Sequence, residues 1–161
     1  MQVRKRTQNP SAYRTPNRNP EAWELTLLGC GTSTGVPLLF CECKVCRSKN
    51  PKNHRLRTSA WLRVGGKSIL IDTSTDLRQQ ALRARIPHLD AILFTHPHAD
   101  HVSGIDEIRS FNYAQKQRIP AFGNAWTCRE LRKRFPYIFA PKGKNEGGGI
   151  PLIDLHEFKA Q

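Results

Sequence analysis

The chain has 161 residues, of which 38% are hydrophobic, and this length and composition suit one globular domain. No apolar run approaches the length of a membrane span, and no apolar secretory segment follows the basic start, so we expect neither a membrane-spanning nor an exported protein. We therefore expect a cytoplasmic protein without a membrane partner. The formal net charge of +13 favours anionic partners, namely phosphate esters and nucleic acid, although a solvated basic surface would give the same count.

Residues 1–20 carry five Arg and Lys side chains, no acid and three prolines. This composition predicts a disordered basic extension. An organelle transit peptide is the alternative, but Pro10, Pro16 and Pro20 would break the amphipathic helix that it needs. The folded domain is expected within residues 21–161.

The first predicted strand, Trp23–Leu28, runs into a glycine-rich loop at Gly29–Pro37. Glycine lets a backbone turn sharply and approach a ligand closely, so the hydroxyl residues of the loop are candidate substrate contacts. They are Thr32, Ser33 and Thr34. An ordinary turn, in which these side chains bond their own backbone, is the alternative interpretation.

Three of the five cysteines lie close together in a polar segment: Cys41, Cys43 and Cys46. This spacing predicts a structural zinc site, whose fourth ligand is His54 or a residue from elsewhere, and three unligated thiols are the alternative. The odd cysteine count without a secretory signal indicates reduced thiols. Cys30 and Cys128 are isolated, and we expect them to be small buried residues.

The segments Ser59–Val64 and Ser68–Ile71 predict two strands of a hairpin around a Gly-Gly turn. A helix is expected to begin at Asp76, with Gln79 in the capping-box position, and to end at Pro87. Further strands are expected at Ala91–Phe94, Ile119–Phe122 and Pro151–Phe158. Two further helices are expected: one at Ser103–Phe111, and a basic one that a Thr127–Glu130 capping box opens and Pro136 stops. Alternating strands and helices predict an α/β protein, and the hairpin predicts a mixed sheet.

Four potential metal ligands stand within six residues, directly after the strand Ala91–Phe94: His96, His98, Asp100 and His101. Imidazole and carboxylate donors together suit zinc, manganese or iron. Four ligands in so short a loop cannot easily reach one ion, but they can present two pairs to two ions. We expect the four side chains to converge at the C-terminal end of this strand, and a loop of solvated histidines is the alternative.

The run Thr95–His101, T-H-P-H-A-D-H, resembles the T-H-x-H-x-D-H signature of the metallo-β-lactamase fold hydrolases. Together with the Gly29–Pro37 loop, the cysteine cluster, the I-L-I-D-T run ending at Thr73 and the D-L-R-Q-Q run from Asp76, roughly residues 23 to 158 resemble the branch around the PhnP phosphodiesterases. The resemblance implies an αββα sandwich with two divalent metal ions, zinc or manganese.

The resemblance also implies the role of each site residue. His96 and His98 would bind the first metal, and Asp100 and His101 the second. Asp72 would brace the metal loop from behind. The three cysteines would be ligands of one structural zinc.

Members of this family also use a third histidine, a bridging aspartate and a last histidine from a later half, and nothing after Glu107 matches those motifs. His156 is a weak candidate. We therefore expect residues 21–161 to form mainly the first half of the sandwich, truncated relative to a full domain. A second chain or self-association would cover the exposed sheet face, and the chain alone would hydrolyse phosphodiesters poorly or not at all.

The predicted function is hydrolysis of a phosphodiester by a dinuclear metal site, with Asp100 also orienting the attacking water. The positive charge agrees with a phosphate-ester substrate. Two alternatives are a ribonuclease Z-like nuclease that processes tRNA and a non-catalytic, zinc-stabilised fragment that binds nucleic acid. The cysteine cluster favours the phosphodiesterase.

Overall fold

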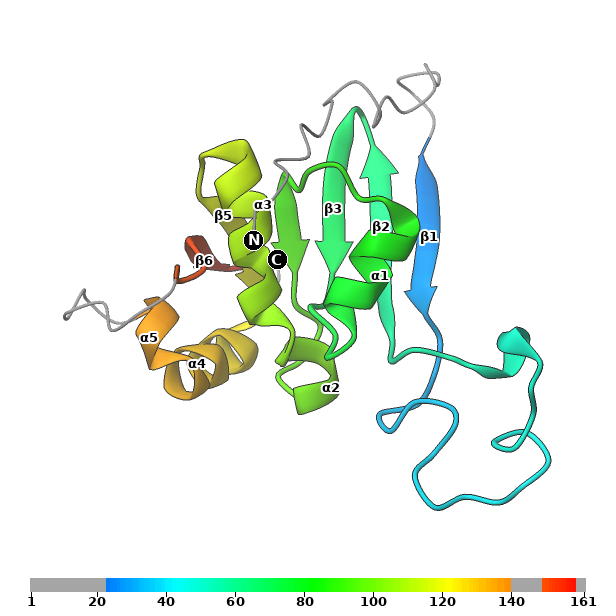
Figure 1. The fold of residues 1–161 in the computed structure, drawn as a ribbon. Coiled ribbons are helices and arrows are strands. Elements are labelled where there is room, and N and C mark those ends of the chain that lie inside the picture. The colour runs from blue at the N-terminus through cyan, green and yellow to red at the C-terminus, as the bar shows by residue number, and fades with distance from the viewer. Residues whose placement is uncertain (1–22, 140–148, 159–161) are drawn as a thin grey trace, which may run out of the picture.

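Six strands form one sheet in the described part of the chain, residues 23–139 and 149–158, of the computed structural model (Figure 1). The strands are β1 (Glu24–Gly29), β2 (Ser59–Val64), β3 (Lys67–Ile71), β4 (Ala91–Leu93), β5 (Ile119–Gly123) and β6 (Ile153–Glu157). They lie side by side in chain order, β1-β2-β3-β4-β5-β6. The basic extension expected at residues 1–20 lies outside the described residues.

The sheet is mixed, as the hairpin predicted. β1, β2 and β3 pair antiparallel, and β3, β4, β5 and β6 pair parallel. Gly65 and Gly66 join β2 to β3 with φ angles of 55° and 73°, which suit a tight hairpin turn. Parallel neighbours need a crossover, so helices stand between β3 and β4 and between β4 and β5.

The helices are α1 (Leu77–Ala84), α2 (Ala99–Val102), α3 (Ile108–Gln115), α4 (Ala125–Arg134) and α5 (Pro136–Phe139), with short 3-10 turns η2 (Pro51–Asn53) and η3 (Ile105–Glu107). The helix expected at Ser103–Phe111 is instead two elements, the turn η3 and the start of α3, with Gly104 outside both. A Cβ on Gly104 would lie 2.1 Å from the Ser74 carbonyl oxygen, so the chain passes too close to Ser74 for a larger residue. None of the helices in the described ranges is long and apolar enough to cross a membrane.

Two predicted helix caps are wrong in detail. α1 begins after Asp76 as predicted, but no side-chain cap forms because the Asp76 carboxylate accepts hydrogen bonds from Arg57. The Thr127–Glu130 capping box does not open α4. The helix begins two residues earlier, where the Asn124 side chain accepts a hydrogen bond from the Thr127 N–H at 2.8 Å.

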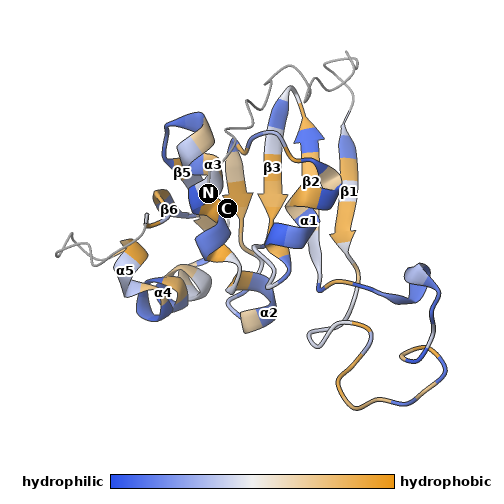
Figure 2. Ribbon diagram, viewed as in Figure 1, coloured by the Kyte–Doolittle hydropathy of each residue, from blue (hydrophilic) through white to orange (hydrophobic). Residues whose placement is uncertain are grey.

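One face of the sheet packs against the helices. Successive strand residues point to opposite faces, and Trp61, Leu70 and Ile92 point to the buried one. Leu77, Ile105, Ile108 and Leu131 from the helices complete the same core. Figure 1 shows α1 and α3 in front of this face, and Figure 2 shows the apolar residues along the central strands.

The opposite face is also apolar, and the described elements leave much of it open. Strand pairing lines up two rows across the sheet, Leu25–Leu62–Ile69–Ala91 and Leu27–Ala60–Ile71–Leu93–Phe122–His156. Leu25 is 47% exposed and Leu27 is 66% exposed. One face of the sheet is therefore buried, and the other is apolar and partly exposed.

Candidate metal centre

The predicted metal loop begins where β4 ends and runs into α2. His96 and His98 precede the helix, with His98 as the extended N-cap residue, whereas Asp100 and His101 lie in the helical turn. His96 and His98 therefore come from the loop and Asp100 and His101 from the helix, and within the described residues no three of their ligand atoms meet within 4.8 Å. The ring centroids of His96 and His98 are 4.6 Å apart, and those of His96 and His101 are 4.0 Å apart. His101 Nε2 lies 3.4 Å from Asp100 Oδ2.

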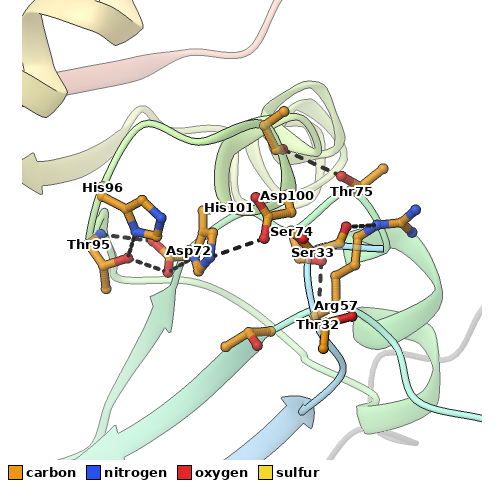
Figure 3. A network of polar contacts seen from close by, with 12 residues as sticks. Thr32, Ser33, Arg57, Asp72, Ser74, Thr75, Thr95, His96, Asp100 and His101 are labelled. Atoms are coloured by element: carbon orange, nitrogen blue, oxygen red, sulfur yellow. Dashed lines mark hydrogen bonds and ion pairs between the residues drawn. The ribbon is translucent and has the colours of Figure 1, made fainter. Parts of the chain in front are cut away.

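The Asp72 carboxylate holds this loop from behind (Figure 3). Asp72 follows β3, is almost fully buried and has a left-handed φ of 62°. Its Oδ1 accepts a hydrogen bond from the Thr95 N–H at 2.8 Å. Its Oδ2 accepts from Thr95 Oγ1 at 2.7 Å and pairs with His101 Nδ1 at 2.7 Å. The bracing role that the resemblance implied therefore has a geometric basis.

These contacts also select the histidine tautomers. A carboxylate accepts, so His101 donates from Nδ1 to Asp72, and in the neutral ring this contact puts the lone pair on Nε2, 3.4 Å from Asp100 Oδ2. The Thr95 hydroxyl donates to Asp72 and so accepts from His96 Nδ1 at 3.0 Å, which leaves His96 Nε2 free as well. Burial lowers the pKa of His96, and the neighbouring His101 and His98 lower it further. Neutral imidazoles with free Nε2 atoms are the form that binds metal.

A later helix contacts the loop from its other side. The Arg134 guanidinium donates a hydrogen bond to the Pro97 carbonyl oxygen. The ring of Trp126 stands edge-on to His98, with centroids 6.4 Å apart and planes at 86°. The sequence pattern revealed neither contact, because α4 begins more than twenty residues after the motif and its packing depends on the fold.

The glycine-rich loop is pinned near the same region. Its backbone closely approaches the segment that precedes β2, since a Cβ on Gly31 would lie 2.6 Å from the Arg55 carbonyl oxygen. Arg57 Nε donates to the Ser33 carbonyl at 3.0 Å (Figure 3). Its Nη1 donates to Asp76 at 2.9 Å. The Thr32 and Thr34 hydroxyls are 3.0 Å apart and exposed. Two hydroxyls of the predicted substrate loop are therefore together and face solvent.

The three clustered cysteines do come together. The sulfur atoms of Cys41, Cys43 and Cys46 all lie within 4.8 Å of one another, and this is the one such group of three metal-binding side chains in the described part of the chain. The Leu38 N–H donates to Cys46 Sγ and the Cys46 N–H to Cys43 Sγ, both at 3.4 Å. The Cys46 N–H and the neighbouring thiols lower the pKa of Cys43 to about 7. The Leu38 N–H lowers the pKa of Cys46, but the neighbouring thiols and burial outweigh it, so the pKa of Cys46 is raised instead. Three adjacent thiols, of which Cys43 ionises easily, fit a zinc ion.

The expected burial of Cys30 is wrong, and the candidate ligands His54 and His156 are not among the grouped metal-binding side chains. His54 Nε2 lies 3.2 Å from the Ser48 carbonyl oxygen, and His54 is not in the cysteine group. Cys30 is exposed, because the chain has already left the sheet at Gly29, whereas Cys128 is buried as expected. His156 stacks on Phe122, with ring centroids 5.3 Å apart.

The beta-lactamase superfamily domain matches residues 67–160 of this chain. The crystal structure of a diphosphatase from the PhnP family is 40% identical, with a TM-score of 0.74 over 85% of this chain and 50% of that protein. Zinc-bound PqqB from Methylobacterium extorquens shares the fold at 18% identity and a TM-score of 0.61, over 83% and 45% of the two chains. The expected α/β fold of this superfamily is confirmed.

An octanoyltransferase of Porphyromonas gingivalis (strain ATCC BAA-308 / W83) is 46% identical over 134 residues, which make up 83% of this chain and 26% of that protein. This chain therefore spans about half the length of the diphosphatase and about a quarter of the octanoyltransferase. Most of the octanoyltransferase lies outside the match.

Replacing Asp72 by Asn tests the bracing carboxylate. Asn keeps the size and tolerates the left-handed backbone, but its amide nitrogen only donates, so it cannot replace the carboxylate oxygen that accepts from Thr95 Oγ1 and His101. We expect Asp72→Asn to weaken manganese binding about 10- to 100-fold in equilibrium dialysis. Manganese is the probe because it prefers nitrogen and oxygen donors to thiolates. The matched control is Asp90→Asn, because Asp90 also accepts a hydrogen bond from a backbone N–H, that of Ser68. Equal manganese affinity of Asp72→Asn and wild type would contradict the bracing role.

The pKa of Cys43 gives a second test, by alkylation of the metal-free chain. The thiolate is the reactive form, so labelling of Cys43 should accelerate as pH rises through about 7 and level off above it. Zinc should protect the three clustered cysteines and leave the exposed Cys30 reactive. Peptide mass mapping measures both effects, and native mass spectra of the triple Cys→Ser variant should lack one metal ion. Labelling that zinc does not change would argue against a cysteine site.

Proposed function

Because this chain belongs to the beta-lactamase superfamily of metal-dependent hydrolases, we propose that it hydrolyses phosphodiesters at a dinuclear metal centre. The observation that carries the proposal is the Asp72 network, which leaves Nε2 of both His96 and His101 free to bind metal. The 40% identity to a PhnP-family diphosphatase supports a phosphate-ester substrate. The net charge of +13 supports an anionic one.

The donors fit the metals that the family implies. His96 and His98 would hold one ion, and Asp100 and His101 the other, as zinc or manganese. When bound, such ions lower the pKa of a water molecule and offset negative charge on the phosphate.

The chain's own residues would perform the remaining tasks. Asp72 holds the imidazoles in the ligand tautomer and stays out of the reaction. Asp100 is the catalytic residue, since its carboxylate beside His101 also orients the attacking water. The exposed hydroxyls of Thr32 and Thr34, with Ser33 between them, contact the substrate phosphate.

We also propose that Cys41, Cys43 and Cys46 hold one structural zinc. Their proximity and the two N–H donors to sulfur support this assignment. Zinc would fasten the long loop between β1 and β2, which Figure 1 shows reaching away from the sheet. Free thiols fit the reducing cytoplasm, which is the location we propose.

The open apolar face is proposed to dock a second sheet, as in the αββα sandwich of the superfamily. The two apolar rows from Leu25 and Leu27 across the sheet support a broad, flat partner. The size of the PhnP-family diphosphatase supports it as well, because half of that protein has no counterpart in this chain. The occupant would be a polypeptide equivalent to that other half.

Turnover of a bis-aryl phosphate tests the function. The purified chain is assayed in zinc or manganese, alone and with a separately produced second half of the PhnP-family diphosphatase. We expect little or no turnover by the chain alone, because each ion has two protein donors where a catalytic zinc usually has three. Adding the second half should raise turnover, and His96→Ala/His98→Ala should abolish it.

Each alternative has its own outcome in this assay. Cleavage of a precursor tRNA in preference to the bis-aryl ester would favour a tRNA-processing nuclease. Nucleic-acid binding with no turnover in any combination would favour a non-catalytic module. Robust turnover by the chain alone, lost in the double variant, would show that these 161 residues already contain a complete site.

The docking face has a separate test. Leu25→Lys/Leu27→Lys should leave the exposed edge folded but weaken binding of the second half roughly a hundredfold or more, since each leucine contributes about 1.5–3 kcal/mol when buried. Isothermal titration calorimetry measures the affinity. The control Leu82→Lys makes the same change on exposed α1. Self-association of the wild-type chain that the double variant abolishes, without binding of the second half, would instead show that the face pairs with a second copy.

A further inference from the structure

Trp126 is a large aromatic side chain placed beside the candidate metal ligands. Its ring stands edge-on to His98, with 6.4 Å between centroids, and the residue is 46% exposed. The core side of α4 is formed by Thr127, Cys128 and Leu131, which are buried. Core packing therefore does not account for the position of Trp126.

The position of Trp126 is held from both ends of its helix. At the start of α4, the Asn124 side chain caps the Thr127 N–H. At the end, Arg134 donates to the carbonyl oxygen of Pro97, which lies between the two histidines His96 and His98. The helix thus holds the indole against the metal loop before any ligand binds. Ligand binding would therefore lose little conformational entropy at this position.

The charge around Trp126 is positive. Arg129 and Lys133 are exposed and follow Trp126 by three and seven residues, so they lie on the same side of the helix. Glu130 is the acid on this side, and it pairs with Arg134 at 3.7 Å. An exposed indole next to two cationic side chains suits a ligand with both an aromatic ring and negative charge.

We propose that Trp126 is the specificity-determining residue that selects phosphate esters carrying an aromatic ring. This inference rests on the proposed function, since it places the phosphate at the metal loop. The ester's ring would stack on the indole while the phosphate meets the loop beside His98. Stacking of this kind is tolerant of ring identity, because every aromatic ring offers a π-face.

Binding of phenyl phosphate and methyl phosphate to the manganese-loaded chain tests the assignment without requiring turnover. The two ligands share the phosphate and differ in the ring. In isothermal titration calorimetry, wild type should bind phenyl phosphate about 5- to 100-fold more tightly. Trp126→Leu should remove most of this preference and leave the affinity for methyl phosphate unchanged. Trp126→Phe should retain much of it, and Tyr113→Ala, at another exposed aromatic, should retain all of it.

The outcomes separate this inference from the proposed function. Equal affinities for the two phosphates in wild type, or a preference that survives Trp126→Leu, would overturn the role of Trp126 and leave phosphodiester hydrolysis standing. Binding of neither phosphate to manganese-loaded protein would overturn both. Loss of methyl phosphate binding in Trp126→Leu would show that Trp126 supports the metal loop, and the specificity role would be wrong.

Discussion

The candidate site depends on the hydrogen bonds that the buried carboxylate of Asp72 accepts. It accepts hydrogen bonds from the Thr95 N–H, the Thr95 hydroxyl and His101. The same Thr95 hydroxyl oxygen accepts a hydrogen bond from His96 Nδ1, so His96 is oriented as well. Since β3 and β4 are adjacent parallel strands, their C-terminal ends meet at one edge of the sheet, and Asp72 and Thr95 face each other there. The left-handed φ of 62° at Asp72 turns its side chain back toward the next strand instead of onward into α1.

The two faces of the sheet differ in burial. One face is closed by α1, α3 and α4 around Leu70 and Ile92, and this core supports the strand ends that carry Asp72 and the metal loop. The other face repeats apolar residues in register from β1 to β5. A face of this kind has the pattern of a sandwich interior. The span of about half the length of the diphosphatase agrees with that pattern.

Local sequence signals succeeded where the deciding interaction was local. The Gly65-Gly66 hairpin, the strand before the metal loop and the burial of Cys128 all follow from short patterns, and the structure confirms them. They failed where another group competed for the same side chain or backbone. Asn124 caps α4 in place of Thr127, and the Asp76 carboxylate accepts from the distant Arg57 instead of capping α1. Cys30 is exposed because burial depends on where the sheet ends.

The sequence by itself determined the chemistry of the site: the spacing of His96, His98, Asp100 and His101 after an apolar strand, and the three clustered cysteines. Those features lie within short stretches, so chain connectivity alone keeps them close. Only the tertiary structure decided that His96 and His101 use Nδ1 in the Asp72 network and what flanks the loop. Trp126 and Arg134 reach His98 and Pro97 through the packing of α4, and packing between residues far apart in sequence leaves no local pattern to detect.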